Sequence, residues 1–284
     1  MPVFVGITMV FAAVACGYML AKGEFILLYQ PAEFVIIWGA AVGSLIMATP
    51  PRVLRRVAGD VMGVFKSSPY GLQRYLETLK LFYVLFQEAR KKGMMGLERD
   101  IEKPEESKLF QLNPNLLRDR RALRFFCDTF RMAIAGGATA YDLDQMIDTD
   151  LEALHEHNEE PVRSLMSSAD ALPGLGIVAA VLGIVVAMSS LGGPPAELGH
   201  KVAAALVGTF LGVLTSYGLV APLAAAISSK HAAELAYYRF LKNGIIAFIK
   251  GHPPLLAVEI ARRSIPYDVR PSFDQMEERC RAQA

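Results

Sequence analysis

Four long stretches of the chain without charged residues limit what it can fold into more than any other feature. They lie before Lys22, between Glu33 and Arg52, between Asp170 and Glu197, and between Lys201 and Lys230. A helix needs about 20 consecutive, mainly apolar residues to cross the hydrocarbon core of a membrane. We therefore expect four transmembrane helices near residues 2–21, 33–50, 172–191 and 202–227.

The second of these stretches is the shortest. Pro50 and Pro51 end it after about 17 residues, near the lower limit for crossing a core of about 30 Å. A re-entrant hairpin is the alternative at this position. The first stretch has no basic residues before it and no small-residue cleavage pattern, so we interpret it as a retained helix and not as a signal peptide.

The basic residues predict the orientation of the chain. Residues 50–170 contain 18 of the 29 Lys and Arg residues, and the tail after residue 228 contains another 9. The remaining two, Lys22 and Lys201, lie in two short connections at the ends of spans. Because basic loops remain on the cytoplasmic side, we expect a multi-pass membrane protein with both termini in the cytoplasm.

Composition excludes several classes of function. With 29 Lys and Arg against 28 Asp and Glu, and 53% hydrophobic residues, neither a disordered chain nor a nucleic-acid binder held by bulk charge is expected. Cys16, Cys127 and Cys280 do not form a disulfide framework. His155 and His157 point about 200° apart on a helix, so we expect no metal there and no cofactor.

The expected fold is all-α. Residues 1–50 and 171–228 form two transmembrane hairpins, residues 51–170 a cytoplasmic helical domain, and residues 229–284 a cytoplasmic helical extension and tail. Within the large loop, apolar periodicity predicts amphipathic helices over 70–92 and 116–134. Thr139 and Asp142 form a candidate capping box that opens a longer helix towards Asp170, interrupted near Pro161. The two apolar stripes consist of Leu72, Leu76, Leu79, Tyr83 and Phe86, and of Leu123, Phe126, Phe130 and Ala133.

The most charged turn of the loop extends from Glu88 to Asp100 and crowds both signs around Gly93 and Gly96. A solvated helix end is one interpretation. The other is a docking surface for a charged partner, because such patches set register and association rate.

We expect no Asp, Glu, Lys or Arg within any of the four spans. If the protein moves protons or cations, the titrating carboxylate is therefore expected to come from another chain. Pro173 and Pro222 lie near the cytoplasmic ends of their spans and should loosen or kink them. The hydroxyl of Thr209 either bonds its own helix or lines a pore. Small residues recur at helix-packing spacing in the pairs Gly39 and Gly43, Gly176 and Ala180, Ala179 and Gly183, and Gly208 and Gly212.

Several of these segments together resemble a known family. They are the run from Pro173 to Gly183, the run from Gly208 to Gly212, and the sequences Tyr217-Gly218 and Ala221-Pro222-Leu223. The tail agrees through Pro254–Glu259, Arg262-Arg263 and Arg270–Phe273. This pattern is similar to the MotA family of flagellar motor stator proteins, within the MotA/TolQ/ExbB proton channel superfamily.

The resemblance implies a function. Members form a pentamer around a dimer of MotB, whose membrane aspartate carries the ion and whose periplasmic domain binds peptidoglycan, and they drive the rotor protein FliG. The resemblance also implies membrane lipid as a partner and the bacterial inner membrane as the location. Arg90 and Glu98 match the family's charged rotor-facing positions, and Asp150 matches a further acid near the rotor.

The resemblance also assigns residues within the membrane. Thr209 matches the hydroxyl beside the partner's aspartate, Pro173 and Pro222 match the two coupling prolines, and Tyr217 lies in the same polar stretch as Thr209. Sodium-driven relatives usually have a hydroxyl residue where this chain has Ala180, so we expect protons as the coupling ion.

An energiser of an outer-membrane system, of the ExbB or TolQ type, is the main alternative, although that type has three spans. An enzyme would need a nucleophile, an acid and base pair or a metal set near the membrane interface, and we identify none. A self-sufficient transporter is disfavoured by the lack of intramembrane charge, and a purely structural scaffold would not need the two prolines.

Overall fold

The computed structural model describes residues 2–281, and its regular elements over that range are all helical. The chain divides into two compact units. The first comprises the residues up to Ser67 together with Asn158–Lys230, and the second comprises Ser68–His157 together with the residues from His231 onward. The helices α9 (Ala140–Met188) and α11 (Ala221–Ile249) each contribute a stretch to both units.

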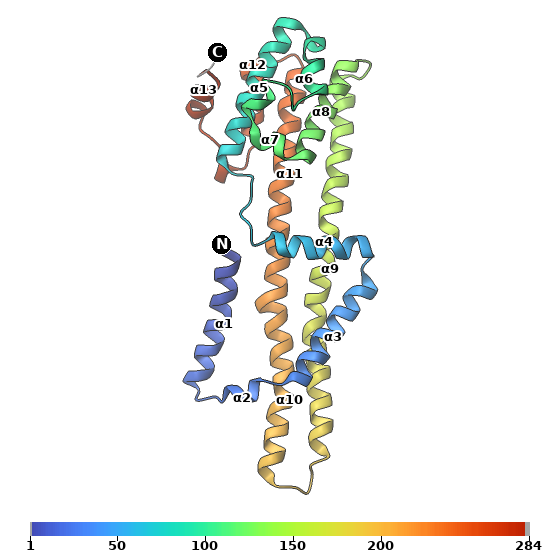
Figure 1. Cartoon of the computed structure of the whole chain (residues 1–284), viewed down its shortest axis with the longest axis vertical. Coiled ribbons are helices and arrows are strands. Elements are labelled where there is room, and N and C mark those ends of the chain that lie inside the picture. The colour runs from blue at the N-terminus through green and yellow to red at the C-terminus, as the bar shows by residue number, and fades with distance from the viewer. Residues whose placement is uncertain (1, 282–284) are drawn as a thin grey trace. The chain divides into compact units, whose positions relative to one another are not determined.

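The first unit contains the apolar helices (Figure 1). Four helical segments are long and apolar enough to cross a membrane, and they fall within Val3–Leu20, Phe25–Ala48, Ala140–Met188 and Pro195–Ile249. This confirms the expectation of four transmembrane helices. The elements are α1 (Pro2–Leu20), α2 (Phe25–Leu28), α3 (Pro31–Ala48), α4 (Pro51–Gly63), the later part of α9, α10 (Pro195–Thr215), a π-helical segment (Ser216–Val220) and the start of α11.

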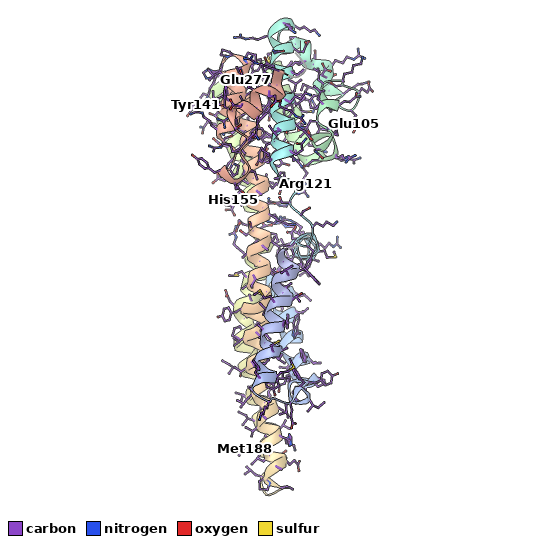
Figure 2. The ribbon with its side chains drawn as sticks, turned by 90° about the vertical axis from the view of Figure 1, so that its left-hand side faces the viewer. Glu105, Arg121, Tyr141, His155, Met188 and Glu277 are labelled. Atoms are coloured by element: carbon purple, nitrogen blue, oxygen red, sulfur yellow. The ribbon has the colours of Figure 1, made fainter. Side chains whose placement is uncertain are left out.

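The apolar surface of these helices remains largely open to the surroundings. Val185 of α9 is 63% exposed, Leu206 of α10 is 60% exposed, and Met188 at the end of α9, labelled in Figure 2, is 54% exposed. A soluble domain rarely exposes so continuous an apolar surface. Such side chains are suited to lipid tails or to other apolar helices.

A short amphipathic helix follows the second span. The helix α4 lies across α9 and α11 (Figure 1), and its Val53 and Val57 pack with Leu165 and Ala224. Its exposed Arg52 lies 3.9 Å from the Glu160 carboxylate of α9. Because α3 is continuous from Pro31 to Ala48, the structure has a full helix and not a re-entrant hairpin at this position.

The expected interruption near Pro161 is wrong. The helix α9 continues for 49 residues through both Pro161 and Pro173. A proline inside a helix removes one hydrogen bond and costs about 3 kcal/mol, but packing of the apolar face on neighbouring helices can outweigh that cost. Leu165 and Ala169 provide such packing, because both are buried between the two prolines.

The second unit is a helical bundle with an aromatic core. Phe82 stacks on Phe86, Phe86 stacks on Phe248 with ring centroids 4.3 Å apart, and Phe126 packs against Phe130. Its elements are α5 (Leu72–Lys92), a 3-10 turn (Met94–Leu97), α6 (Glu98–Glu102), a second 3-10 turn (Phe110–Leu112), α7 (Pro114–Arg118), α8 (Arg120–Ala135), the start of α9, most of α11, α12 (Pro254–Arg263), a third 3-10 turn (Tyr267–Val269) and α13 (Phe273–Arg281).

Two details of this unit differ from the sequence prediction. The helix expected over 116–134 is split at Asp119, whose side chain accepts a hydrogen bond from the Ala122 amide and thereby caps α8. In α5 the buried face is rotated, so that Leu72 is exposed while Tyr75 and Phe82 are buried. The capping box of Thr139 and Asp142 is confirmed, because each residue bonds the backbone amide of the other.

A buried arginine joins several helices of the second unit. The guanidinium of Arg74 lies 4.7 Å from the ring centroid of Tyr70 and 4.5 Å from that of Tyr237, and it bonds Asp119 at 2.6 Å. The hydroxyls of Tyr237 and Thr78 lie 2.8 Å apart, which extends the polar network into the core.

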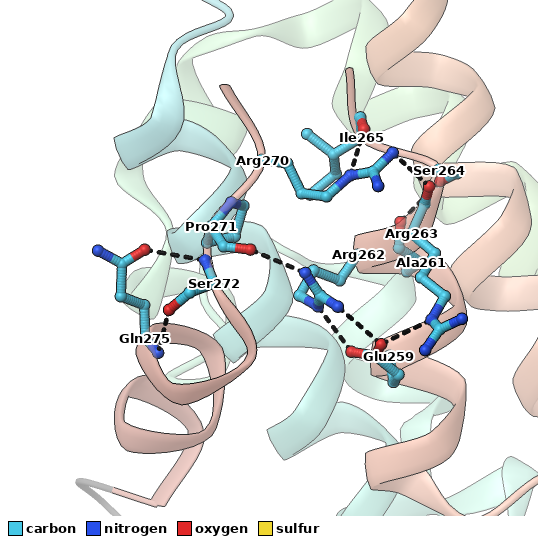
Figure 3. Close-up of polar contacts among 10 residues, drawn as sticks. All are labelled: Glu259, Ala261, Arg262, Arg263, Ser264, Ile265, Arg270, Pro271, Ser272 and Gln275. Atoms are coloured by element: carbon cyan, nitrogen blue, oxygen red, sulfur yellow. Dashed lines mark hydrogen bonds and ion pairs between the residues drawn. The ribbon is translucent and has the colours of Figure 1, made fainter. Parts of the chain in front are cut away.

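The C-terminal part has its own polar cluster (Figure 3). Arg262 donates two hydrogen bonds to the Glu259 carboxylate, at 2.6 and 2.8 Å, and a third to the Pro271 carbonyl. Arg270 bonds the Ile265 carbonyl at 2.8 Å. These contacts hold the segment between α12 and α13 against α12.

Candidate functional site

The helices α9 and α10 meet through their backbones. A Cβ placed on Gly212 would lie 2.7 Å from the Leu172 carbonyl oxygen and 2.8 Å from the Gly176 Cα, and one placed on Gly176 would lie 2.8 Å from the Gly208 carbonyl oxygen. Real Cβ atoms do not approach so closely, so only glycine fits. The helix-packing role predicted for Gly176, Gly208 and Gly212 is confirmed, whereas a Cβ on Gly39 or Gly43 would meet no other element within 4 Å among residues 2–281.

Ala180 and Thr209 lie beside this contact. The Ala180 amide nitrogen lies 3.1 Å from a Cβ placed on Gly208, and the Thr209 Cα lies 3.3 Å from one placed on Gly176. Ala180 is 6% exposed. The structure therefore brings these two predicted ion-path residues to one crossing of α9 and α10.

The two predicted coupling prolines are linked through a serine. Pro173 has no N–H, so the helical partner of the Ala169 carbonyl, four residues earlier, is missing. The Ser216 hydroxyl donates a hydrogen bond of 2.6 Å to that carbonyl, and both groups are buried. Ser216 begins the π-helical segment that ends at Val220, immediately before Ala221-Pro222.

The π-helical segment is the only such segment within residues 2–281, and π-helical turns inside helices frequently occur at functional sites. This segment is the loosening of the helix that was expected at Pro222, since the ring of Pro222 and its missing N–H disturb the preceding turn. Tyr217 lies in this segment with its side chain 66% exposed, so it points away from the contact made by Ser216.

One expectation about the membrane part is wrong. The apolar segment Phe25–Ala48 includes Glu33, which was treated as the boundary of the second span. The helix α3 begins at Pro31, so Glu33 occupies its first turn, and the residue is only 6% exposed. The spans of this chain therefore include a buried carboxyl group of their own.

The charged turn in the second unit exposes both of its predicted residues. Arg90 lies in the last turn of α5 and Glu98 begins α6, and both side chains are exposed. Gly93 ends α5 with a φ of 75°, a conformation that glycine adopts without strain. The 3-10 turn Met94–Leu97, anchored by the buried Leu97, then leads the chain into α6.

The surroundings of Arg90 and Glu98 are strongly charged. Glu88 pairs with Lys92 at 2.8 Å, and hydrogen bonding to Lys92 lowers the pKa of the Glu88 carboxyl despite some burial. A depression of about 400 Å³ lies beside this turn and is lined by charged side chains, including Lys92, Arg99 and Asp100. Such a surface suits a partner with charges of both signs.

Asp150 lies on α9 and is exposed. It lines a different depression, of about 550 Å³, with Arg120, Arg121 and Arg124 of α8. The depression that Arg90 shares with Met94 and His252 does not include Asp150. The three predicted rotor-interaction residues thus belong to one unit, but only Arg90 and Glu98 lie at the same turn.

Sequence reasoning missed two residues of the membrane part. Glu33 was missed because a charge was taken as the end of a span, although the apolar segment Phe25–Leu28 and Pro31 come before it. No role was predicted for Ser216. Its distance of four residues beyond Gly212, on the face that contacts α9, is the signal that could have paired it with Ala169.

Comparisons with known proteins agree along the whole chain. Residues 4–93 match the family described as Motility protein A N-terminal, and residues 118–239 match the MotA/TolQ/ExbB proton channel family. The chain is 37% identical to Motility protein A of Salmonella typhimurium and 38% identical to Motility protein A of Escherichia coli. Each alignment covers 99% of this chain and 96% of the relative.

Solved structures agree in fold. The structure of the flagellar MotAB stator complex from Bacillus subtilis matches with a TM-score of 0.75 at 23% identity and covers 96% of this chain and 97% of that one. The structure of C. jejuni MotAB matches with a TM-score of 0.79 at 19% identity and covers 95% of this chain and 98% of that one.

Proposed function

We propose that five copies of this chain surround a MotB dimer and drive the rotor protein FliG. The premise is that the chain belongs to the motility protein A family, and is thereby a flagellar stator protein that conducts protons with MotB. The chain aligns with motility and chemotaxis proteins over nearly their whole length, which favours this function over that of an ExbB or TolQ energiser. Both termini and the charged turn face the cytoplasm in this proposal.

The observation that carries the proposal is the crossing of α9 and α10 at glycines, with Ala180 and Thr209 beside it. In the assembly, Thr209 offers its hydroxyl to the ion-binding aspartate of MotB. Ala180 presents a methyl group, which provides no oxygen to a dehydrated cation. The coupling ion is therefore the proton.

The prolines couple ion movement to a change in helix shape. Protonation of the partner's aspartate alters the contact beside Thr209. The π-helical segment, which contains Tyr217 and is followed by Pro222, is the part between α10 and α11 that changes its conformation most readily. The Ser216 hydrogen bond passes this change to α9 at Pro173. Since α9 and α11 both continue into the second unit, they carry it to the rotor-facing residues.

The energy of each step sets how strongly the rotor can be held. One charge crossing 100 mV releases about 2.3 kcal/mol, and one pH unit adds about 1.4 kcal/mol. A step can therefore break only one or two charge-assisted contacts. The exposed Arg90 and Glu98, with Asp150 as a secondary contact, form interactions of that size.

The test is proton flux, measured by intracellular pH in cells that lack other stators. The chain is expressed with a MotB partner whose plug is deleted, and each chain is also expressed alone. Flux that requires both chains and does not change with sodium supports the proposal. The absence of flux from an assembled pair contradicts it.

Ala180→Thr tests the choice of ion. The added hydroxyl at the buried crossing should reduce proton flux, whereas Ala40→Thr on the exposed face of α3 should not. Equal proton flux in both variants, with equal amounts of assembled protein, would contradict the role of Ala180.

A further inference from the structure

Glu33 has surroundings that are unusual for a carboxyl group. It lies in the first turn of α3 within an apolar segment, it is 6% exposed, and its Oε2 is buried without a hydrogen-bond partner among residues 2–281. An ionised carboxylate in such a place is strongly disfavoured unless a proton or a cation accompanies it. Ionisable groups inside membranes are for this reason associated with ion pathways.

The carboxyl group reaches the glycine contact between α9 and α10. A Cβ on Gly208 would lie 2.5 Å from Glu33 Oε2, and a Cβ on Gly183 would lie 3.2 Å from Oε1. The absence of side chains at these two positions creates the space that the carboxyl group occupies. Glu33 thus lies against the backbones of two further spans.

The same contact places Glu33 close to the proposed ion site. Gly208 directly precedes Thr209, and Ala180 lies one helical turn, about 5 Å, from Gly183. Gly183 is on the side of Ala180 that leads to the connection over residues 189–194. Glu33 therefore lies between that connection and the crossing where Ala180 and Thr209 meet.

The parts of α9 and α10 that form the glycine contact, and the short helix α2 before α3, contain no other titratable group. Residues 171–188 of α9, residues 202–215 of α10 and residues 25–28 of α2 contain no Asp, Glu, Lys, Arg or His. The nearest charged residues along α10 are Glu197 and Lys201, which pair with each other at 3.1 Å. Any proton held by this chain near the glycine contact is therefore held by Glu33.

We propose that Glu33 is a proton-binding group of the channel, one step before the aspartate of MotB. A proton arriving from the connection over 189–194 forms an O–H bond with the Glu33 carboxylate. That bond breaks when the proton passes, directly or through water, to the ionised aspartate beside Thr209, and Glu33 returns to its ionised form. This inference depends on the proposed proton channel and adds a second carboxyl group to its path.

Glu33→Gln is the decisive variant, because it keeps the size and shape of the side chain and removes proton binding. With the plug-deleted MotB partner, it should reduce proton flux by about tenfold or more, while membrane level and copurification with MotB remain unchanged. Glu33→Asp keeps a carboxyl group and should retain part of the flux with a shifted pH dependence. Glu24→Gln, at an exposed position between α1 and α2, is the matched control and should leave the flux unchanged.

The outcomes separate the two levels of inference. Flux from Glu33→Gln within twofold of the parent would overturn the role of Glu33, while the proposed function would stand because the parent conducts. A parent without flux would overturn the proposed function itself. If Glu33→Gln does not assemble, infrared difference spectra of the parent complex and of Glu33→Asp decide. A carboxyl band that follows pH and shifts in Glu33→Asp supports proton binding, and its absence rejects it.

Discussion

The hydroxyl of Ser216 donates a buried hydrogen bond of 2.6 Å to the carbonyl of Ala169, which lost its helical partner because Pro173 has no N–H. The two residues are 47 positions apart in the chain. The contact joins the disturbed turn of one helix to the disturbed turn of the other, so the two prolines act on a shared structure.

Ser216→Ala should destabilise the membrane unit by about 1–3 kcal/mol, because the Ala169 carbonyl would be buried without a partner. Thermal unfolding of the purified complex with MotB measures the effect. Ser229→Ala, at an exposed position of α11, is the control and should not change the melting temperature. Equal melting temperatures for the two variants would show that the hydrogen bond contributes nothing.

Gly212→Ala should disrupt the packing of α9 on α10. The new methyl group would meet the Leu172 carbonyl oxygen at 2.7 Å, and backbone on both sides cannot move without separating the helices. We expect a loss of about 1–3 kcal/mol or more, seen as a reduced amount of chain in the membrane. Gly39→Ala adds the same methyl group where no atom lies within 4 Å, so its level should match that of the parent.

Arg74→Met should destabilise the second unit by about 3 kcal/mol, since Asp119 would lose its charged partner and the two tyrosine rings would lose the guanidinium between them. Arg74→Lys should recover only part of this loss, because an ammonium group cannot reproduce the planar contact. Thermal unfolding provides the measurement. Full recovery by lysine would reduce the role of Arg74 to its charge alone.

Acid should weaken the C-terminal cluster of the second unit. Hydrogen bonds from Arg262 lower the pKa of the Glu259 carboxyl below its ordinary value of 4.5, and burial opposes them only in part. The folded-state pKa is thus lower than the unfolded one, so this stability is present above about pH 4.5 and is lost as the pH falls through the folded value. Glu259→Gln should reduce the free energy of unfolding at pH 7 by about 2 kcal/mol and so lower the melting temperature. In acid, the melting temperature of this variant should decrease less than that of the parent. A parallel decrease in both proteins would contradict this assignment.

Arg90→Glu should reduce swimming speed several-fold while the stator still localises at the motor, since the side chain is exposed. Arg279→Glu reverses an exposed charge on α13 and should leave swimming unchanged. Swimming is measured together with the localisation of a fluorescently tagged MotB partner. A variant that no longer localises would indicate a role in assembly and would count against a rotor contact.

The spans could be predicted from the sequence because charge is absent over four stretches, and lipid tolerates little else. The glycine contact was also predictable, since Gly176, Gly208 and Gly212 are spaced for close helix packing. The capping box of Thr139 and Asp142 lies within four consecutive residues, so it could be predicted from the local sequence. In each case the pattern and its physical cause lie within a few residues of one another.

The missed features depend on residues far apart in the sequence. The carboxylate of Asp119, which caps α8 where the predicted helix is split, also accepts a hydrogen bond from Arg74, which lies 45 positions earlier and gives no local signal. The bonding of Ser216 to Ala169 requires knowing which faces of α9 and α10 meet. Glu33 was assigned to a boundary because a charge normally ends a span, and only the space beside Gly183 and Gly208 shows that its carboxyl group fits inside.

The contact between α9 and α10 has a practical consequence for building hybrid stators. Side chains can change rotamer to accommodate a foreign partner, but the contact at Gly176, Gly208 and Gly212 consists of backbone and has no such freedom. The backbone of each helix therefore fits the backbone of the other helix in this chain, and a helix from another protein would not fit in its place. Segments exchanged between relatives should therefore include both helices, from Ala169 to Pro222, as a single replaceable part.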